Sequence, residues 1–212
     1  MPDRPAPQGL QRPATVHDNL DGTRTECFEV DCSEPGLLAL LKDIFEEHWG
    51  QVIFGPCIEG AVFEGRFARR PRVSLLDGYA TVQVEDSESW HFHLCIGPHH
   101  GSAALPTPPE LAAWRRCARA AFFMNRDPAG RPSAWGFRMW NGRGEQMLTV
   151  FFPNPWIDPA RQRYVDTPVW SRLELWMRMR AQWAAVTTRR RPMTTPLQWP
   201  LPQPWLSWWV GS

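Results

Sequence analysis

The sequence predicts an α+β protein in which an antiparallel meander sheet is covered on one face by two or three helices. Short alternating segments follow one another between residues 51 and 96 with links of a few residues, and such links join antiparallel neighbours. The dipeptides Asp77-Gly78 and Asn141-Gly142 favour tight hairpin turns. Other segments carry apolar residues at the spacing of a helix.

Composition divides the 212 residues into three parts. Residues 1–24 are rich in Pro, Gly, Asp and Arg without periodicity, and we expect them to form a flexible N-terminal arm. Residues 25–188 hold the periodic segments and are expected to form a single α+β domain. Residues 189–212 begin with arginines and continue with Trp and Pro, which indicates an extended C-terminal tail.

Charge and cysteine content limit the class of protein. The net charge of +1 gives no overall attraction to nucleic acid. Five cysteines without a CxxC pair indicate reduced thiols, as in the cytoplasm. The N-terminus lacks the apolar run of a signal peptide, and no segment approaches the roughly 20 apolar residues of a membrane-spanning helix. We therefore expect a soluble cytoplasmic protein that binds no nucleic acid.

The first expected elements are a short strand near residues 26–30 and a helix that follows it. Ser33 is a typical N-cap, Pro35 suits the first helical turn, and Gly50 favours the end of the helix. One face of this helix is apolar and consists of Leu37, Leu41, Ile44, Phe45 and His48. We expect His48 to be a core histidine satisfied by one hydrogen bond.

Strands are expected from residue 51 onward. Residues 52–54 form a short apolar run, and residues 61–67 alternate between apolar and polar side chains. Residues 72–84 are expected to form a hairpin around Asp77-Gly78. A polar turn at residues 86–89 then leads into a strand at residues 90–96.

A second helix is expected over residues 107–124, because Thr107 and Glu110 have the spacing of a capping box. Residues 135–152 then read as two strands joined by a turn that contains Asn-Gly. A last helix is expected over residues 167–187, with Thr at its N-cap and Pro at its first turn.

The strand at residues 90–96 carries the strongest functional signal. Trp90, Phe92, Leu94 and Ile96 fall on one face at the strand period of two, and the other face consists of His91, His93 and Cys95. His99 and His100 lie in the loop that follows, so four of the six histidines are close together in sequence.

These side chains predict a metal site with His91, His93, Cys95, His99 and His100 as ligands. Imidazole and thiolate suit a transition metal such as zinc, iron(II), copper or nickel. Glu64 or Glu59 on a neighbouring strand is expected to complete the site or to act as a base, with His93 as a further catalytic residue. The alternative is that the histidines are structural and only occupy an exposed sheet face.

The string from His91 to Ile96 resembles the motif of the histidine-triad nucleotide hydrolases, with Cys95 where the third histidine would stand. The resemblance implies that His93 takes the place of the nucleophile that attacks a nucleotide α-phosphate. His91 would then be a supporting histidine. The similarity covers about seven residues of the chain.

The second hairpin carries Arg138, Arg143, Glu145 and Gln146 near its turn. Guanidinium groups bind carboxylate or phosphate through two hydrogen bonds, so Arg138 and Arg143 are predicted to hold an anionic substrate. The alternative is a solvated hairpin tip with a surface ion pair.

The tail at residues 189–212 predicts a different kind of function. Spaced Trp and Pro residues suit docking on a protein, either this chain or a partner. Contact with a membrane surface is the less favoured alternative, because indole rings also prefer the headgroup zone. The rival to a metal-binding protein is therefore a non-catalytic interaction or assembly protein that binds its partner through this tail.

Overall fold

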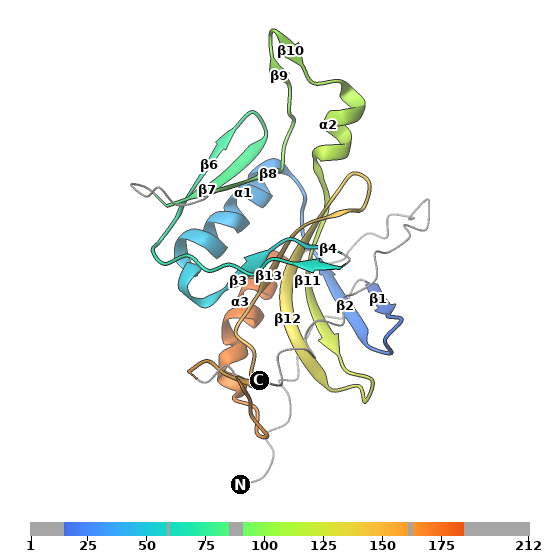
Figure 1. The fold of residues 1–212 in the computed structure, drawn as a ribbon, viewed down its shortest axis with the longest axis vertical. Helices are drawn as coiled ribbons and strands as arrows, with labels where there is room; N and C mark the ends of the chain where they lie inside the picture. The colour runs from blue at the N-terminus through green and yellow to red at the C-terminus, as the bar shows by residue number, and fades with distance from the viewer. Residues whose placement is uncertain (1–14, 59, 85–90, 161–162, 185–212) are drawn as a thin grey trace.

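The structure, a computed structural model, describes residues 15–58, 60–84, 91–160 and 163–184. Its main feature is a six-stranded antiparallel sheet in the order β1-β2-β11-β12-β13-β3 (Figure 1). These strands are β1 (Thr15–Asp18), β2 (Arg24–Glu29), β3 (Ile53–Gly55), β11 (Cys117–Arg126), β12 (Pro132–Asn141) and β13 (Gln146–Phe151). The predicted α+β class with an antiparallel sheet is confirmed.

A smaller antiparallel sheet lies beside the first one. It has the order β6-β7-β8 and consists of β6 (Arg72–Leu76), β7 (Tyr79–Gln83) and β8 (Phe92–Cys95). The predicted histidine strand is thus an edge strand of the small sheet and not a central strand of the large one. Three further pairs of two-residue strands are β4 (Cys57–Ile58) with β5 (Ala61–Val62), β9 (Gly101–Ser102) with β10 (Leu105–Pro106), and β14 (Ile157–Asp158) with β15 (Arg163–Tyr164).

Three α-helices accompany the sheets in the described residues: α1 (Glu34–Lys42), α2 (Pro109–Arg115) and α3 (Glu174–Trp183). Short helical turns lie at Asp43–Glu47, Trp49–Gln51 and Trp170–Leu173. Figure 1 shows α1 between the small sheet and the large one. No described helix is long and apolar enough to span a membrane.

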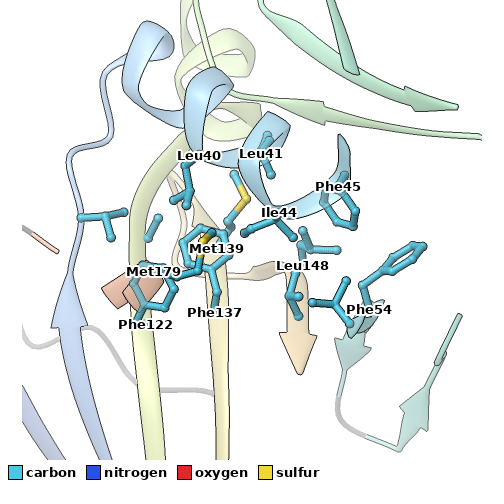
Figure 2. Packing of buried hydrophobic residues seen from close by; sticks show 14 of the residues in the cluster. Leu40, Leu41, Ile44, Phe45, Phe54, Phe122, Phe137, Met139, Leu148 and Met179 are labelled. Atoms are coloured by element: carbon cyan, nitrogen blue, oxygen red, sulfur yellow. The ribbon is translucent and has the colours of Figure 1, made fainter. Parts of the chain in front are cut away.

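The main core lies between the large sheet and the helices. One row of paired residues crosses five strands and consists of Phe28, Phe122, Phe137, Val150 and Phe54, all of which are buried. Leu40 of α1, Ile44 of the helical turn that follows it and Met179 of α3 belong to the cluster packed on this face (Figure 2). Burial of so many large apolar side chains is the dominant stabilising contribution to such a layer.

Local signals place α1 and the hairpin of β6 and β7 as expected. Ser33 is the N-cap of α1, and its hydroxyl accepts a hydrogen bond from the backbone N–H of Gly36. In the hairpin turn, Asp77 has φ of 45° and Gly78 has φ of 76°. Two positive φ values in succession are the requirement of a two-residue hairpin turn, which Asp-Gly meets at low cost.

The predicted helix over residues 107–124 is wrong in its second half. The helix α2 ends at Arg115, and its N-cap is Pro108 without a side-chain cap bond. From Cys117 the chain forms β11, which pairs with β2 on one side and with β12 on the other. Residues 120–124 are buried without interruption, because a strand in the middle of the sheet is covered on both faces. Its apolar run therefore lacks the alternation that would have predicted a strand.

The ends of the domain also differ from expectation. Thr15–Asp18 lies within the stretch expected as a flexible arm, but it forms β1 and pairs with β2. The last helix begins as a short turn at Trp170 and becomes α-helical only at Glu174. The predicted tail at residues 189–212 lies outside the described residues.

Candidate functional site

His91 and His93 lie next to each other at the exposed edge of the small sheet. Their ring centroids are 4.9 Å apart and their planes are nearly perpendicular, at 76°. The Nδ1 atom of His93 is 2.7 Å from the hydroxyl of Thr81 on β7. Both imidazoles are exposed, so they can reach a ligand from solvent. The nucleophile role of His93 that the histidine-triad resemblance implies stays a prediction.

Cys95 does not share this exposed surface. It is only 2% exposed and lies opposite Tyr79 of β7 in the sheet register. Burial raises the pKa of the Cys95 thiol, with a smaller opposing effect from the Tyr79 hydroxyl. A thiol that stays protonated is a poor metal ligand and a poor nucleophile.

His99 and His100 are directed to the carboxylate of Asp77. The Nδ1 atom of His99 is 2.8 Å from Oδ2 of Asp77, and Nδ1 of His100 is 3.1 Å from Oδ1. The backbone N–H groups of His100 and Gly101 also donate to this carboxylate, at 2.9 Å each. These backbone hydrogen bonds are the main reason why the pKa of Asp77 falls to about 2. The carboxylate thus fastens the loop after β8 to the hairpin turn.

The five predicted metal ligands are therefore divided between separate places. Among the described residues, no group of three or more His, Cys, Asp or Glu side chains is arranged to hold a metal ion. Glu64, the predicted base, is exposed, and its charge acts on Cys57 of β4. Glu59 lies outside the described residues.

The two predicted substrate arginines also lie apart. Arg143 is in the exposed turn between β12 and β13, where its guanidinium lies over the Trp114 ring at 3.5 Å from the ring centroid. The Trp114 indole N–H in turn donates to Glu145 at 2.8 Å. These contacts join α2 to the hairpin tip, which agrees with the alternative of a surface cluster.

Arg138 occupies the middle of β12, on the face of the large sheet that the helices do not cover. We call this the helix-free face, because its buried cluster of Cys27, Ala121, Phe123 and Trp140, with Phe151 packed against it, contains no helix residue. One row of this face runs from Glu29 through Ala121 and Arg138 to Thr149. Arg138, which was predicted to bind a substrate, therefore lies on a sheet face that carries both aromatic and polar side chains.

The contacts of Arg138 leave its charge without a counter-ion. Its Nε donates to the Thr149 hydroxyl at 3.0 Å, and its Cζ lies 4.6 Å from the centroid of the Phe123 ring. Burial lowers the pKa of the Arg138 guanidinium. In the described part of the chain, Arg138 forms no ion pair with an acidic side chain.

Arg119 lies on the same face and shows the opposite arrangement. Its guanidinium donates to both carboxylate oxygens of Glu29, with its shortest contact at 2.6 Å, and lies 4.5 Å from the centroid of the Trp140 ring. Burial acts to lower the pKa of Arg119, but the hydrogen bonds that its guanidinium donates to this carboxylate raise the pKa above its usual value. Arg119 was not among the predicted site residues, because residues 117–124 were expected to be helical. Recognising residues 117–126 as a strand would have placed it with Ala121 and Phe123.

A groove of about 730 Å³ lies elsewhere, between α1 and β6. Lys42, Arg69 and Arg70 line it together with Leu38 and Val73. Arg70 is paired with Glu47 at 2.6 Å, and the carboxylate of Glu46 accepts a hydrogen bond from the backbone of Val73. Arg72 lines the groove as well, and all four cationic side chains are exposed, so water and salt screen their charges.

The fold and this geometry define an α+β protein in which Arg138, on one face of the main sheet, has no acidic partner among the described residues. Residues 14–185 match a family described as a family of unknown function, DUF7676, and the chain belongs to this family. No curated protein matches the sequence. A solved structure titled "Crystal structure of ChuX" is similar at 13% identity, covers 74% of this chain and 76% of that chain, and has a TM-score of 0.45.

Proposed function

We propose that this protein binds a small anionic ligand on the helix-free face of its large sheet, with Arg138 as the partner of the anion. The observation that carries the proposal is the half-buried guanidinium of Arg138, which has no acidic partner among the described residues. A charge removed from water is costly unless it is paired. A carboxylate or phosphate group of a ligand would supply the missing partner.

The surroundings of Arg138 favour a ligand that has an apolar or aromatic body. Phe123 is only 1% exposed, but Phe151, which packs against it, is half-buried and is the apolar side chain of this cluster that a ligand can contact. Thr149 accepts hydrogen bonds from both Arg138 and Gln146, at 3.0 and 2.6 Å, so the Arg138 side chain is held in one orientation. A fixed guanidinium loses less conformational entropy when it binds an anion bidentately.

Two probes test this proposal, benzoate and phenyl phosphate, each titrated into the full chain by isothermal titration calorimetry. The Arg138→Met variant keeps the apolar stem and removes the charge. Because a charged hydrogen bond contributes about 1.5–3 kcal/mol, its affinity for the bound probe is expected to fall by about tenfold or more. Arg143→Met, on the same hairpin but at its exposed tip, is the matched control and should bind as the wild type does. Equal affinity in the Arg138→Met variant, or no binding by the wild type, would contradict the proposal.

A second candidate function is metal binding by two histidines in place of the five ligands predicted from the sequence. The adjacent rings of His91 and His93 support it, because they are exposed and their centroids are 4.9 Å apart. Two imidazoles are an incomplete ligand set for zinc, copper or nickel, and a further ligand must come from solvent or from another molecule. This candidate uses neither Cys95 nor the loop histidines, because their positions commit them to other contacts.

A further inference from the structure

Arg180 of α3 is buried in the layer between the helix and the large sheet. The residue is only 5% exposed. Its Cζ lies 4.6 Å from the centroid of the Phe28 ring and 5.2 Å from that of the Trp176 ring. These two rings meet edge to face at 77°, with centroids 5.8 Å apart, so they line two sides of the guanidinium.

Two nitrogens of the Arg180 guanidinium are buried without a hydrogen-bond partner in the described part of the chain. These atoms are Nε and Nη1, and Arg180 forms no ion pair within the described ranges. Burial lowers the pKa of Arg180, but a guanidinium stays protonated in proteins. The ring contacts are favourable for a cation, yet they satisfy no N–H group.

Arg119 shows how a largely buried arginine is paired elsewhere in this fold. Arg119 is also largely buried, and the carboxylate of Glu29 meets its guanidinium on two nitrogens. On α3 the acidic residue is Glu174, which is exposed and lies six positions before Arg180. Residues six apart do not share a helix face, so Glu174 is poorly placed to pair with Arg180.

We propose that Arg180 is the binding site of a small carboxylate. The rings of Phe28 and Trp176 restrict approach to the guanidinium, and a flat carboxylate in the guanidinium plane needs less room than a tetrahedral phosphate. Nε and Nη1 are the two buried nitrogens, whereas Nη2 is not among them, so Nη2 is the atom at which a carboxylate oxygen would reach the guanidinium. The site lies on the helix-covered face of the sheet and is independent of the ligand proposed for Arg138.

Thermal unfolding of the full chain at constant ionic strength tests this site. Acetate is the probe, and phosphate and chloride are the comparison anions. Acetate several-fold above its Kd is expected to raise the Tm of the wild type by about 2–4 °C, because only the folded state holds the site. Phosphate and chloride should have a smaller effect. In Arg180→Met the acetate response should be lost, and without acetate this variant should be at least as stable as the wild type, since no charge is buried unpaired.

Three further variants make the result specific. Arg178→Met removes an exposed arginine two residues away on the same helix and should keep the acetate response. Arg138→Met should also keep it, which separates this site from the ligand site on the other face. If Arg180→Met fails to fold, Arg180→Lys replaces it and should show a reduced response. A wild type that does not respond to acetate, or an Arg180 variant that responds fully, would overturn the proposal.

Discussion

The imidazole of His99 and the carboxylate of Asp77 are 2.8 Å apart, although 22 positions separate the two residues in the chain. Asp77 sits at the turn of the β6–β7 hairpin with a positive φ, and His99 follows β8. The ring of His99 also packs edge-on against Tyr79, at 4.9 Å between centroids. One carboxylate therefore holds the loop after the histidine strand in place.

Replacing Asp77 by Asn should weaken this anchor without changing the backbone, because Asn tolerates a positive φ. The folded-state pKa of Asp77 is about 2, below its usual 3.8. A depressed carboxylate pKa stabilises the fold above the unfolded pKa, and this contribution is lost as pH falls toward the folded pKa. The variant should therefore be less stable than the wild type at pH 7, and the difference should shrink between about pH 4 and pH 2.

Urea unfolding at pH 7, 4, 3 and 2 measures this difference in the free energy of unfolding. His100→Ala is a useful companion, because its side chain is exposed while its backbone N–H donates to Asp77. It should keep most of the pH dependence. A stability gap between wild type and Asp77→Asn that is the same at every pH would contradict the assigned role of the charge.

The paired rings of His91 and His93 give a prediction about metal ions. Either His91→Ala or His93→Ala should abolish the binding of Zn²⁺ or Ni²⁺ at this edge, because one exposed imidazole is a weak ligand. Cys95→Ala should leave binding unchanged, since its thiol is buried and protonated. Calorimetric titration of each ion into the untagged protein measures the effect. If Cys95→Ala loses metal binding while the two histidine variants keep it, Cys95 is a metal ligand, as the sequence predicted.

The sequence predicted the elements whose signals are local. The cap at Ser33 and the turn at Asp77-Gly78 are read from a few neighbouring residues, and both are present in the structure. The strand β11 was not predicted, because its apolar residues face two buried surfaces and have no alternating pattern. Its central position depends on pairing with β2, whose residues are about 100 positions away.

In the candidate sites, too, local sequence patterns predicted some features, while others depend on tertiary contacts. Alternation predicted one shared face for His91, His93 and Cys95; the rings of His91 and His93 do lie together, but Cys95 is buried beside Tyr79, which is a tertiary effect. Arg138 was chosen for the chemistry of its guanidinium, while its lack of an acidic partner is visible only across strands. Arg180 gave no signal, because charged helix residues are usually exposed.

Gly136 of β12 is predicted to tolerate no side chain. A Cβ at this position would lie 2.2 Å from the Phe123 ring and 2.6 Å from the carbonyl oxygen of Val150. Neither neighbour can move freely, since Phe123 is buried and Val150 is part of the sheet backbone. Gly136→Ala should lower the free energy of unfolding by about 1–3 kcal/mol, as overpacking does. Gly50→Ala, where no atom lies within 4 Å, is the control and should have little effect in the same denaturant titration.

Trp176 connects α3 to the middle of β12. Loss of its indole N–H should therefore destabilise the contact between the helix and this strand. The side chain is fully buried, and its indole N–H donates to the carbonyl oxygen of Gly136 at 3.0 Å. Trp176→Phe removes this donor and leaves the buried carbonyl without it, which should cost about 1–3 kcal/mol of unfolding free energy. Trp183→Phe is the matched control, because its indole N–H donates to Asp43 in a half-buried position where water can replace it. If Trp183→Phe is the more destabilising of the two in chemical denaturation, the bond from Trp176 is not what fixes α3 to the sheet.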